Sequence, residues 1–180
     1  MSISSITAND AILLELARQT GELLEQNGLK LVSAESCTGG WIGQIVTAIP
    51  GSSSWYDCGF ITYSNSSKQQ ILRVQRSTLA QSGAVSEQTA REMALGALAQ
   101  SQAQVAISVT GIAGPAGGSV EKPVGTVCFA WVLGNASITS ANSKTCQFSG
   151  DREAIRRQSV VIALQGILEL LENTTPLNFA

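Results

Sequence analysis

Residues 29–48 read LKLVSAESCTGGWIGQIVTA, and this stretch carries the signature of an α/β domain. Residues 29–34 have the composition of a strand, and residues 38–48 indicate a helix that opens at Gly39 and Gly40. A strand that turns into a helix is the repeating unit of α/β folds. Ser36 lies in the turn between them, where the N–H groups of a helix N-terminus can hold an oxyanion or a phosphate.

The segments on either side predict a complete domain. Upstream, apolar residues recur at helical spacing from Asn9 or Asp10 to the stop signal Asn27-Gly28. Downstream, the predicted elements are strands at 60–63, 105–109, 124–133 and 136–148, and helices that begin near Lys68, Ser86 and Asp151. The last two strands form a predicted hairpin around Gly134-Asn135. Alternating strands and helices followed by a hairpin predict a single three-layer α/β/α domain on a mixed sheet over residues 1–180, with its core at about 9–172.

Composition narrows the class of protein. The chain has 180 residues, 44% of them apolar, which is enough for one core without metal or disulfide staples. The net charge of −2 without a basic cluster argues against nucleic-acid binding. Four scattered cysteines and the absence of histidine predict reduced thiols and no metal site. Without a signal-like N-terminus or a long apolar run, we expect a soluble cytoplasmic protein with no membrane contact.

The missing histidine shapes the candidate chemistry, because a serine nucleophile then needs another base. A lysine of lowered pKa is the natural choice, and Lys68 is predicted in the first turn of a helix, where the macrodipole disfavours its charge. Tyr63 could relay a proton or orient that pair. Each residue also has a simpler interpretation: Ser36 as a helix cap, Lys68 as a solvated cation and Tyr63 as a half-buried strand residue.

Two further features admit more than one interpretation. Cys37 is a rival nucleophile, since a helix N-terminus favours a thiolate. The glycine-rich segment 110–119 matches neither GxxxxGK[ST] nor GxGxxG, so it could wrap one small anionic group or form a surface turn. Arg152, Arg156 and Arg157 could meet a phosphate or be solvated on a helix surface.

Several motifs occur together in an order that is highly specific. They lie at residues 34–40 (AESCTGG), 59–65 (GFITYSN) with Lys68, 83–86 (GAVS), 110–118 (TGIAGPAGG), 122–127 (KPVGTV) and 148–152 (FSGDR). In this the chain resembles the CinA C-terminal domain family, whose stand-alone members are nicotinamide-nucleotide amidases. The resemblance runs from about Ala11 to Leu171.

This resemblance implies hydrolysis of the carboxamide of nicotinamide mononucleotide (NMN) to nicotinic acid mononucleotide and ammonia, in pyridine nucleotide salvage and without metal or cofactor. It implies a serine nucleophile that works with a lysine and a tyrosine, here Ser36, Lys68 and Tyr63. It also implies a homo-oligomer. The residues expected to bind substrate are Thr38, Gly39, Gly40, Thr110, Gly111, Gly114 and Arg152.

The chain departs from the family pattern at Ser66, where many relatives carry an acidic residue that could tune the lysine. It also leaves no room for the molybdopterin-binding-like domain of longer relatives, so we expect no function from one. Two alternatives stay open. One is a catalytically silent nucleotide-binding or interaction domain, and the other is an amidase for another small carboxamide.

Overall fold

A computed structural model of the protein describes residues 9–134 and 139–172. The elements are α1 (Asp10–Gln26), β1 (Leu31–Glu35), α2 (Trp41–Thr47), the 3-10 turn η1 (Ser52–Ser54), β2 (Tyr56–Ile61), α3 (Asn65–Leu72), α4 (Arg76–Ser82), α5 (Glu87–Ala99), β3 (Val105–Gly111), β4 (Thr126–Gly134), β5 (Thr139–Gln147) and α6 (Arg152–Glu172). They form an α/β fold, as the sequence predicted.

The strands form one five-stranded sheet in the order β2-β1-β3-β4-β5. Strand β1 pairs in parallel with both β2 and β3, whereas β4 runs antiparallel to β3 and to β5. The predicted mixed sheet and the pairing of the last two strands are therefore confirmed. The predicted hairpin turn includes Asn135, which lies outside the described residues.

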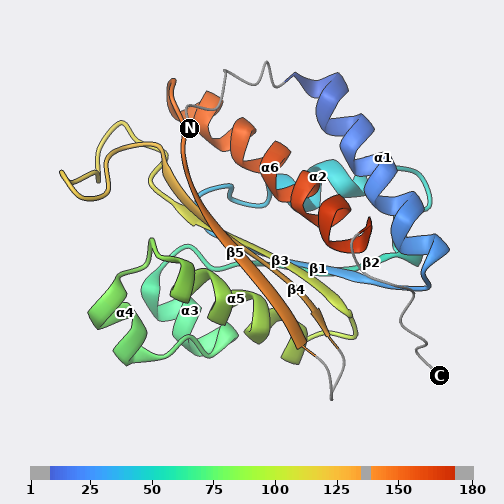
Figure 1. Ribbon diagram of the computed structural model, residues 1–180, viewed down its shortest axis with the longest axis horizontal. Coiled ribbons are helices and arrows are strands. Elements are labelled where there is room, and N and C mark those ends of the chain that lie inside the picture. Colours follow the sequence, from blue (N-terminus) through green and yellow to red (C-terminus); the bar gives the residue numbers. More distant parts are fainter. Residues whose placement is uncertain (1–8, 135–138, 173–180) are drawn as a thin grey trace.

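Helices cover both faces of the sheet. Helices α1, α2 and α6 lie on one face, and α3, α4 and α5 lie on the other (Figure 1). Strand β4 is buried along its whole length because its alternate side chains enter two separate cores. Val127, Phe129 and Trp131 pack towards α6, while Cys128, Ala130 and Val132 pack towards α5.

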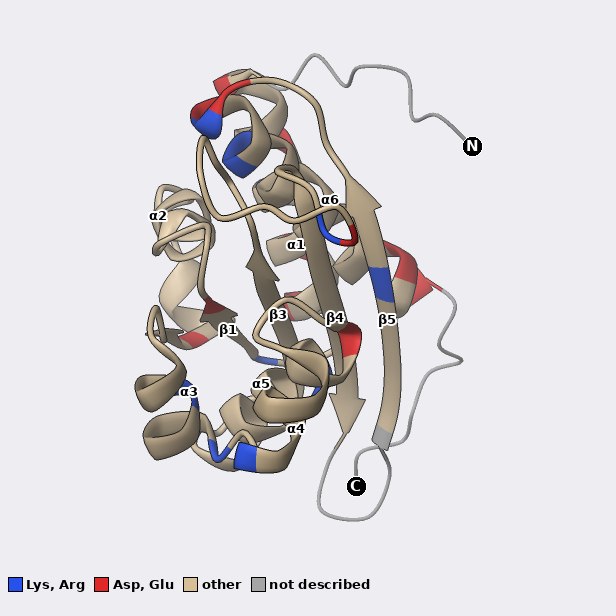
Figure 2. Cartoon of the chain, turned by 90° about the vertical axis from the view of Figure 1, so that its left-hand side faces the viewer, with Lys and Arg blue, Asp and Glu red and all other residues tan. Residues whose placement is uncertain are grey.

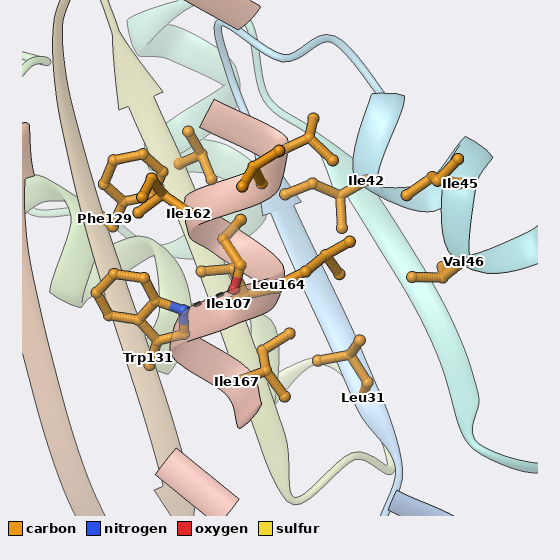
Figure 3. Close-up of a cluster of buried hydrophobic side chains, with 14 of the residues drawn as sticks. Leu31, Ile42, Ile45, Val46, Ile107, Phe129, Trp131, Ile162, Leu164 and Ile167 are labelled. Carbon is orange, nitrogen blue, oxygen red and sulfur yellow. Dashed lines mark hydrogen bonds between the residues drawn. The ribbon is translucent and has the colours of Figure 1, made fainter. Parts of the chain in front are cut away.

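The core on the α6 side holds the larger side chains (Figure 3). There, Trp131 donates its indole N–H to the Ala163 carbonyl of α6 at 2.9 Å, so the ring is buried with its polar atom satisfied. The core on the α5 side has smaller residues, which lets α5 approach closely. A Cβ at Gly96 of α5 would overlap the Leu72 carbonyl at the end of α3, so glycine is required where these helices meet.

Most helices start close to the residues at which the sequence predicted them to start. Asn9 caps α1, Ser86 caps α5, and the Asp151 carboxylate accepts the Ala154 N–H at 2.9 Å at the start of α6, so these three helices start where the sequence predicted. Helix α3 begins at Asn65 rather than near Lys68, because Ser64 and Ser67 form a capping box.

Other predicted boundaries were wrong by a few residues. Strand β1 ends at Glu35 and β2 spans Tyr56–Ile61 rather than 60–63, since parallel pairing with β1 begins at Tyr56. Helix α2 starts at Trp41 instead of residue 38. Helix α4 and the turn η1 were not predicted.

This topology brings the ends of three parallel strands to one edge of the sheet. Glu35, Ile61 and Gly111 end β1, β2 and β3, and the Ser36 N–H donates to the Val109 carbonyl at 2.9 Å across this edge. In α/β sheets, ligands bind outside the carboxyl ends of parallel strands. Acidic and basic residues are interspersed over the described helices and loops in Figure 2, in keeping with the small net charge.

Candidate active site

Ser36 opens a five-residue turn between β1 and α2. The turn closes through Gly39 and Gly40, whose φ angles of 63° and 96° are left-handed and favour glycine. Gly40 is the N-cap of α2, so Ser36 lies four positions before the cap and does not cap the helix. The interpretation of Ser36 as a helix cap is therefore wrong.

The Glu35 carboxylate holds this turn instead. It is 1% exposed and accepts the N–H groups of Gly40, Ile42 and Gly43 at 3.0, 3.1 and 2.9 Å. These are the donors that a helix N-terminus leaves unpaired, so an internal anion already occupies the start of α2. The sequence analysis did not single out Glu35, since capping residues are normally adjacent to the helix they cap.

Lys68 of α3 reaches the turn from the opposite layer. Its amine donates to the Ser36 hydroxyl at 2.9 Å and to the Thr62 carbonyl at 2.8 Å, and its side chain is 1% exposed. The structure thus brings together two residues that lie 32 positions apart. The interpretation of Lys68 as a solvated cation is wrong.

Burial is the main influence on this amine. It lowers the pKa of Lys68 from 10.5 to about 8, because a charged amine is poorly solvated inside the protein. The hydrogen-bond partners of the amine are a hydroxyl and backbone carbonyls, and within residues 9–134 and 139–172 no carboxylate forms a salt bridge with it. The neutral amine is therefore accessible near neutral pH.

Tyr63 lies beside this pair through its backbone and beside Arg152 through its side chain. Its carbonyl is 3.5 Å from the Lys68 amine, and its phenol oxygen accepts a hydrogen bond from Arg152 Nη2 at 2.9 Å. In the described residues the phenol makes no hydrogen bond to Ser36 or Lys68. Tyr63 is 62% exposed and follows the end of β2 at Ile61, so it is not a half-buried strand residue.

Arg152 connects Tyr63 to the glycine-rich segment. Its Nη1 donates to the Gly114 carbonyl at 2.8 Å, and Gly114 has a left-handed φ of 77°. Thr110 and Gly111 belong to strand β3 rather than to the loop. The Thr110 hydroxyl donates to the Ala84 carbonyl at 2.8 Å, which anchors the segment before α5.

A cavity of about 660 Å³ opens next to the Ser36 turn. Gly39, Trp41 and Arg152 contribute to its wall, so two of the predicted substrate-binding residues face the same space. The hydroxyls of Thr38 and Thr62 are buried near this edge of the sheet, and neither has a hydrogen-bond partner among the described residues.

Cys37 is a poor candidate for the nucleophile. Burial raises the pKa of its thiol to about 12, so the residue is protonated at neutral pH despite its place before α2. Glu35 contributes to the same shift through its negative charge.

The described residues show neither a metal centre nor a membrane span. They contain no group of three or more acidic or cysteine residues that could hold a metal ion. None of their helices combines the length and the apolar character needed to cross a membrane.

Comparison with known proteins gives consistent matches. The sequence model of the CinA C-terminal domain family matches residues 13–171 of this chain. Nicotinamide-nucleotide amidohydrolase PncC of Escherichia coli K12 is 49% identical over 166 residues, which covers 92% of this chain and 99% of the relative. The enzyme of the same name from Enterobacter agglomerans is 52% identical over 162 residues, covering 89% and 97%. A CinA superfamily protein from Klebsiella pneumoniae 700603 superposes with a TM-score of 0.85 at 36% identity, covering 90% and 99%.

Proposed function

The chain belongs to the CinA C-terminal domain family, and we propose that it is a nicotinamide-nucleotide amidohydrolase that uses Ser36 as nucleophile and Lys68 as base. The enzyme converts NMN and water to nicotinic acid mononucleotide and ammonia. The observation that carries the mechanism is the 2.9 Å hydrogen bond between the Lys68 amine and the Ser36 hydroxyl.

Lys68 activates the nucleophile in its neutral form. With a pKa of about 8, roughly one amine in ten is neutral at pH 7, against fewer than about one in a thousand for an ordinary lysine. The lone pair of the neutral amine accepts the Ser36 proton as the hydroxyl oxygen attacks the carboxamide carbon. Burial therefore supplies the base that histidine provides in other hydrolases.

The turn supplies candidate donors for the oxyanion. The Gly39 N–H donates to the Ser36 carbonyl and the Gly40 N–H to Glu35. The N–H groups of Cys37 and Thr38 donate to no other residue in the described parts of the chain, which leaves them for substrate. One positioned donor is typically worth roughly 3 kcal/mol of transition-state stabilisation.

The reaction then proceeds in two halves. The Lys68 ammonium returns its proton to the leaving nitrogen, the C–N bond breaks, and ammonia departs from an ester between Ser36 and the nicotinate carbonyl. Water attacks this ester as Lys68 accepts one of its protons, and the Ser36 oxygen is reprotonated as the acid is released.

The ribose phosphate part of the substrate is bound near Arg152. Arg152, with Gly114 of the glycine-rich segment, holds the 5′-phosphate, because a guanidinium is suited to phosphate oxygens. Tyr63 assists the proton transfer between Ser36 and Lys68. Its carbonyl lies next to the Lys68 amine, and its phenol oxygen is held by Arg152. As the sequence predicts, we further propose that the enzyme is a homo-oligomer of the cytoplasm.

The decisive test is ammonia release from NMN by the purified protein, with a metal chelator present and with Ser36→Ala in parallel. Release by the wild type alone supports both the reaction and the nucleophile. Substantial release by Ser36→Ala contradicts the nucleophile assignment. Binding of NMN in calorimetry without release points instead to a silent nucleotide-binding domain, and preference for another carboxamide contradicts the substrate.

A further inference from the structure

Arg156 of α6 makes contacts that differ from those of its neighbours. Its Nε donates to the Cys37 carbonyl at 3.1 Å and its Nη2 to the Thr38 carbonyl at 2.7 Å. The guanidinium also lies over the Trp41 ring, 5.2 Å from its centroid. One rigid, planar cation therefore holds two successive peptide groups of the turn that follows Ser36.

These contacts fix the direction of the peptide N–H groups. In a trans peptide the C=O and the next N–H point in opposite directions. Because the carbonyls of Cys37 and Thr38 face Arg156, the N–H groups of Thr38 and Gly39 point away from it. The Gly39 N–H is already bound to the Ser36 carbonyl at 3.1 Å, whereas the Thr38 N–H has no acceptor in the part of the chain that the structure describes.

Thr38 carries a second donor without a partner. Its hydroxyl is fully buried and makes no hydrogen bond to any described residue. A buried polar group without a partner is costly and calls for an explanation, such as a ligand that satisfies it. Two donors on one residue, two positions after the nucleophile, thus lack a partner among the described residues, and substrate must displace the atoms that cover this fully buried residue to reach them.

We infer that Thr38 donates to the oxyanion formed on the substrate carboxamide, and that Arg156 is the positioning residue that holds its peptide for this task. The inference deepens the proposed function and rests on it. Besides fixing the geometry, a cation at the Cys37 carbonyl polarises the peptide and strengthens the Thr38 N–H as a donor. A donor that is already oriented needs no reorganisation when charge develops.

Arg157 provides a matched control on the same helix. Its guanidinium lies 4.9 Å from the same Trp41 ring, but its hydrogen bonds go to Asp10 and Glu153 rather than to the turn. A role limited to packing on Trp41 would affect both arginines alike. A role in holding the turn is specific to Arg156.

The test compares the steady-state kinetics of Arg156→Ala, Arg156→Lys and Arg157→Ala with NMN as substrate. We expect Arg156→Ala to lower kcat about 100-fold, with KM changed less than about threefold, because the oxyanion exists only in the transition state. Arg156→Lys keeps the positive charge but not the planar guanidinium that binds two carbonyls at once. Its kcat should lie between the values of the wild type and of Arg156→Ala. Arg157→Ala, which removes a side chain from the same cavity but no contact to the turn, should lower kcat at least about tenfold less than Arg156→Ala does. Millimolar guanidinium should restore part of the activity of Arg156→Ala.

Other outcomes overturn the inference in recognisable ways. An increase in KM at constant kcat for Arg156→Ala would make Arg156 a substrate-binding residue. Equal losses of kcat in the two alanine variants, or no rescue by guanidinium, would make it a packing residue. If Arg156→Ala does not fold, the kcat of Arg156→Lys decides, and a wild-type value rejects the inference. Failure of the proposed function is distinct, since it would appear as an inactive wild type or an active Ser36→Ala.

Discussion

Tyr63 and Arg152 share a hydrogen bond of 2.9 Å between the phenol oxygen and the guanidinium, although they lie 89 positions apart. The sequence assigns these residues to different tasks, Tyr63 to catalysis and Arg152 to substrate binding. Because Arg152 also binds the Gly114 carbonyl, the phenol is linked to the glycine-rich segment. A substitution that removes only the phenol oxygen of Tyr63 can therefore show whether this oxygen serves catalysis or holds Arg152.

Replacing Tyr63 by Phe removes the phenol oxygen and leaves the ring. If the phenol takes part in proton transfer, kcat should fall roughly 100-fold with little change in KM. Steady-state kinetics with NMN measure both constants, and thermal unfolding of the variant controls for folding. An increase in KM alone would instead assign Tyr63 to holding Arg152.

The pH dependence of the reaction should report Lys68. Its pKa of about 8 means that the amine is charged below this pH and neutral above it. The value of kcat/KM should accordingly rise through an apparent pKa near 8 and then level off. Lys68→Met should lower the rate by orders of magnitude and abolish this rise. A flat profile in the wild type between pH 6 and 9 would argue against the lysine base.

The same pKa predicts an effect on stability. Between pH 8 and 10.5 the unfolded chain binds more protons at Lys68 than the folded chain does, so the free energy of unfolding rises with pH there. Below pH 8 both states are charged, and the folded state carries the full cost of burial. Lys68→Met lacks this cost, so its stability relative to the wild type should be greatest below pH 8 and decline towards pH 10.5. Urea denaturation of both proteins across this range measures the difference.

Replacing Glu35 by Gln tests what holds the turn. The carboxylate accepts three N–H groups, and an amide presents one oxygen and an NH₂ group that cannot accept. We expect the free energy of unfolding to fall by roughly 2–4 kcal/mol, with a parallel loss of activity. Urea denaturation measures this, and Glu25→Gln is the control, because Glu25 is exposed and accepts from Ser54 at the surface. Equal stabilities for the two variants would contradict the role of Glu35.

Replacing Cys37 by Ala separates the two possible nucleophiles. Because burial raises the pKa of Cys37 to about 12, the thiol should not react at pH 7. The variant should keep kcat within several-fold and lose about 1 kcal/mol or somewhat more of stability. Ammonia release and alkylation of the wild type with iodoacetamide check this. A well-folded but inactive Cys37→Ala would make the thiol the nucleophile again.

The sequence predicts those parts of the molecule that depend on local patterns or on chemical necessity. The caps Asn9, Ser86 and Asp151 lie next to the helices they start. The pairing of Ser36 with Lys68 follows from the absence of histidine and from the family resemblance, and the hydrogen bond between them agrees with it.

The contacts that the sequence did not predict join residues that lie far apart in the chain. Glu35 binds N–H groups five to eight positions away, beyond the reach of the usual capping motifs. Arg156 contacts carbonyls about 120 positions away, and nothing in its own helix distinguishes it from Arg157. Such contacts are set by the packing of α6 against the turn, which no local pattern records.

Gly96 of α5 packs closely against Leu72 at the end of α3. The position of α3, and therefore of Lys68, depends on a helix that follows later in the chain. In an unfolded or half-assembled chain, the amine is solvated and fully charged, and it has no hydroxyl to deprotonate. Its lowered pKa is therefore acquired on folding and is not a property of the residue itself. Activity that depends on the proposed lysine base therefore reports whether α3 and α5 have packed together on their face of the sheet.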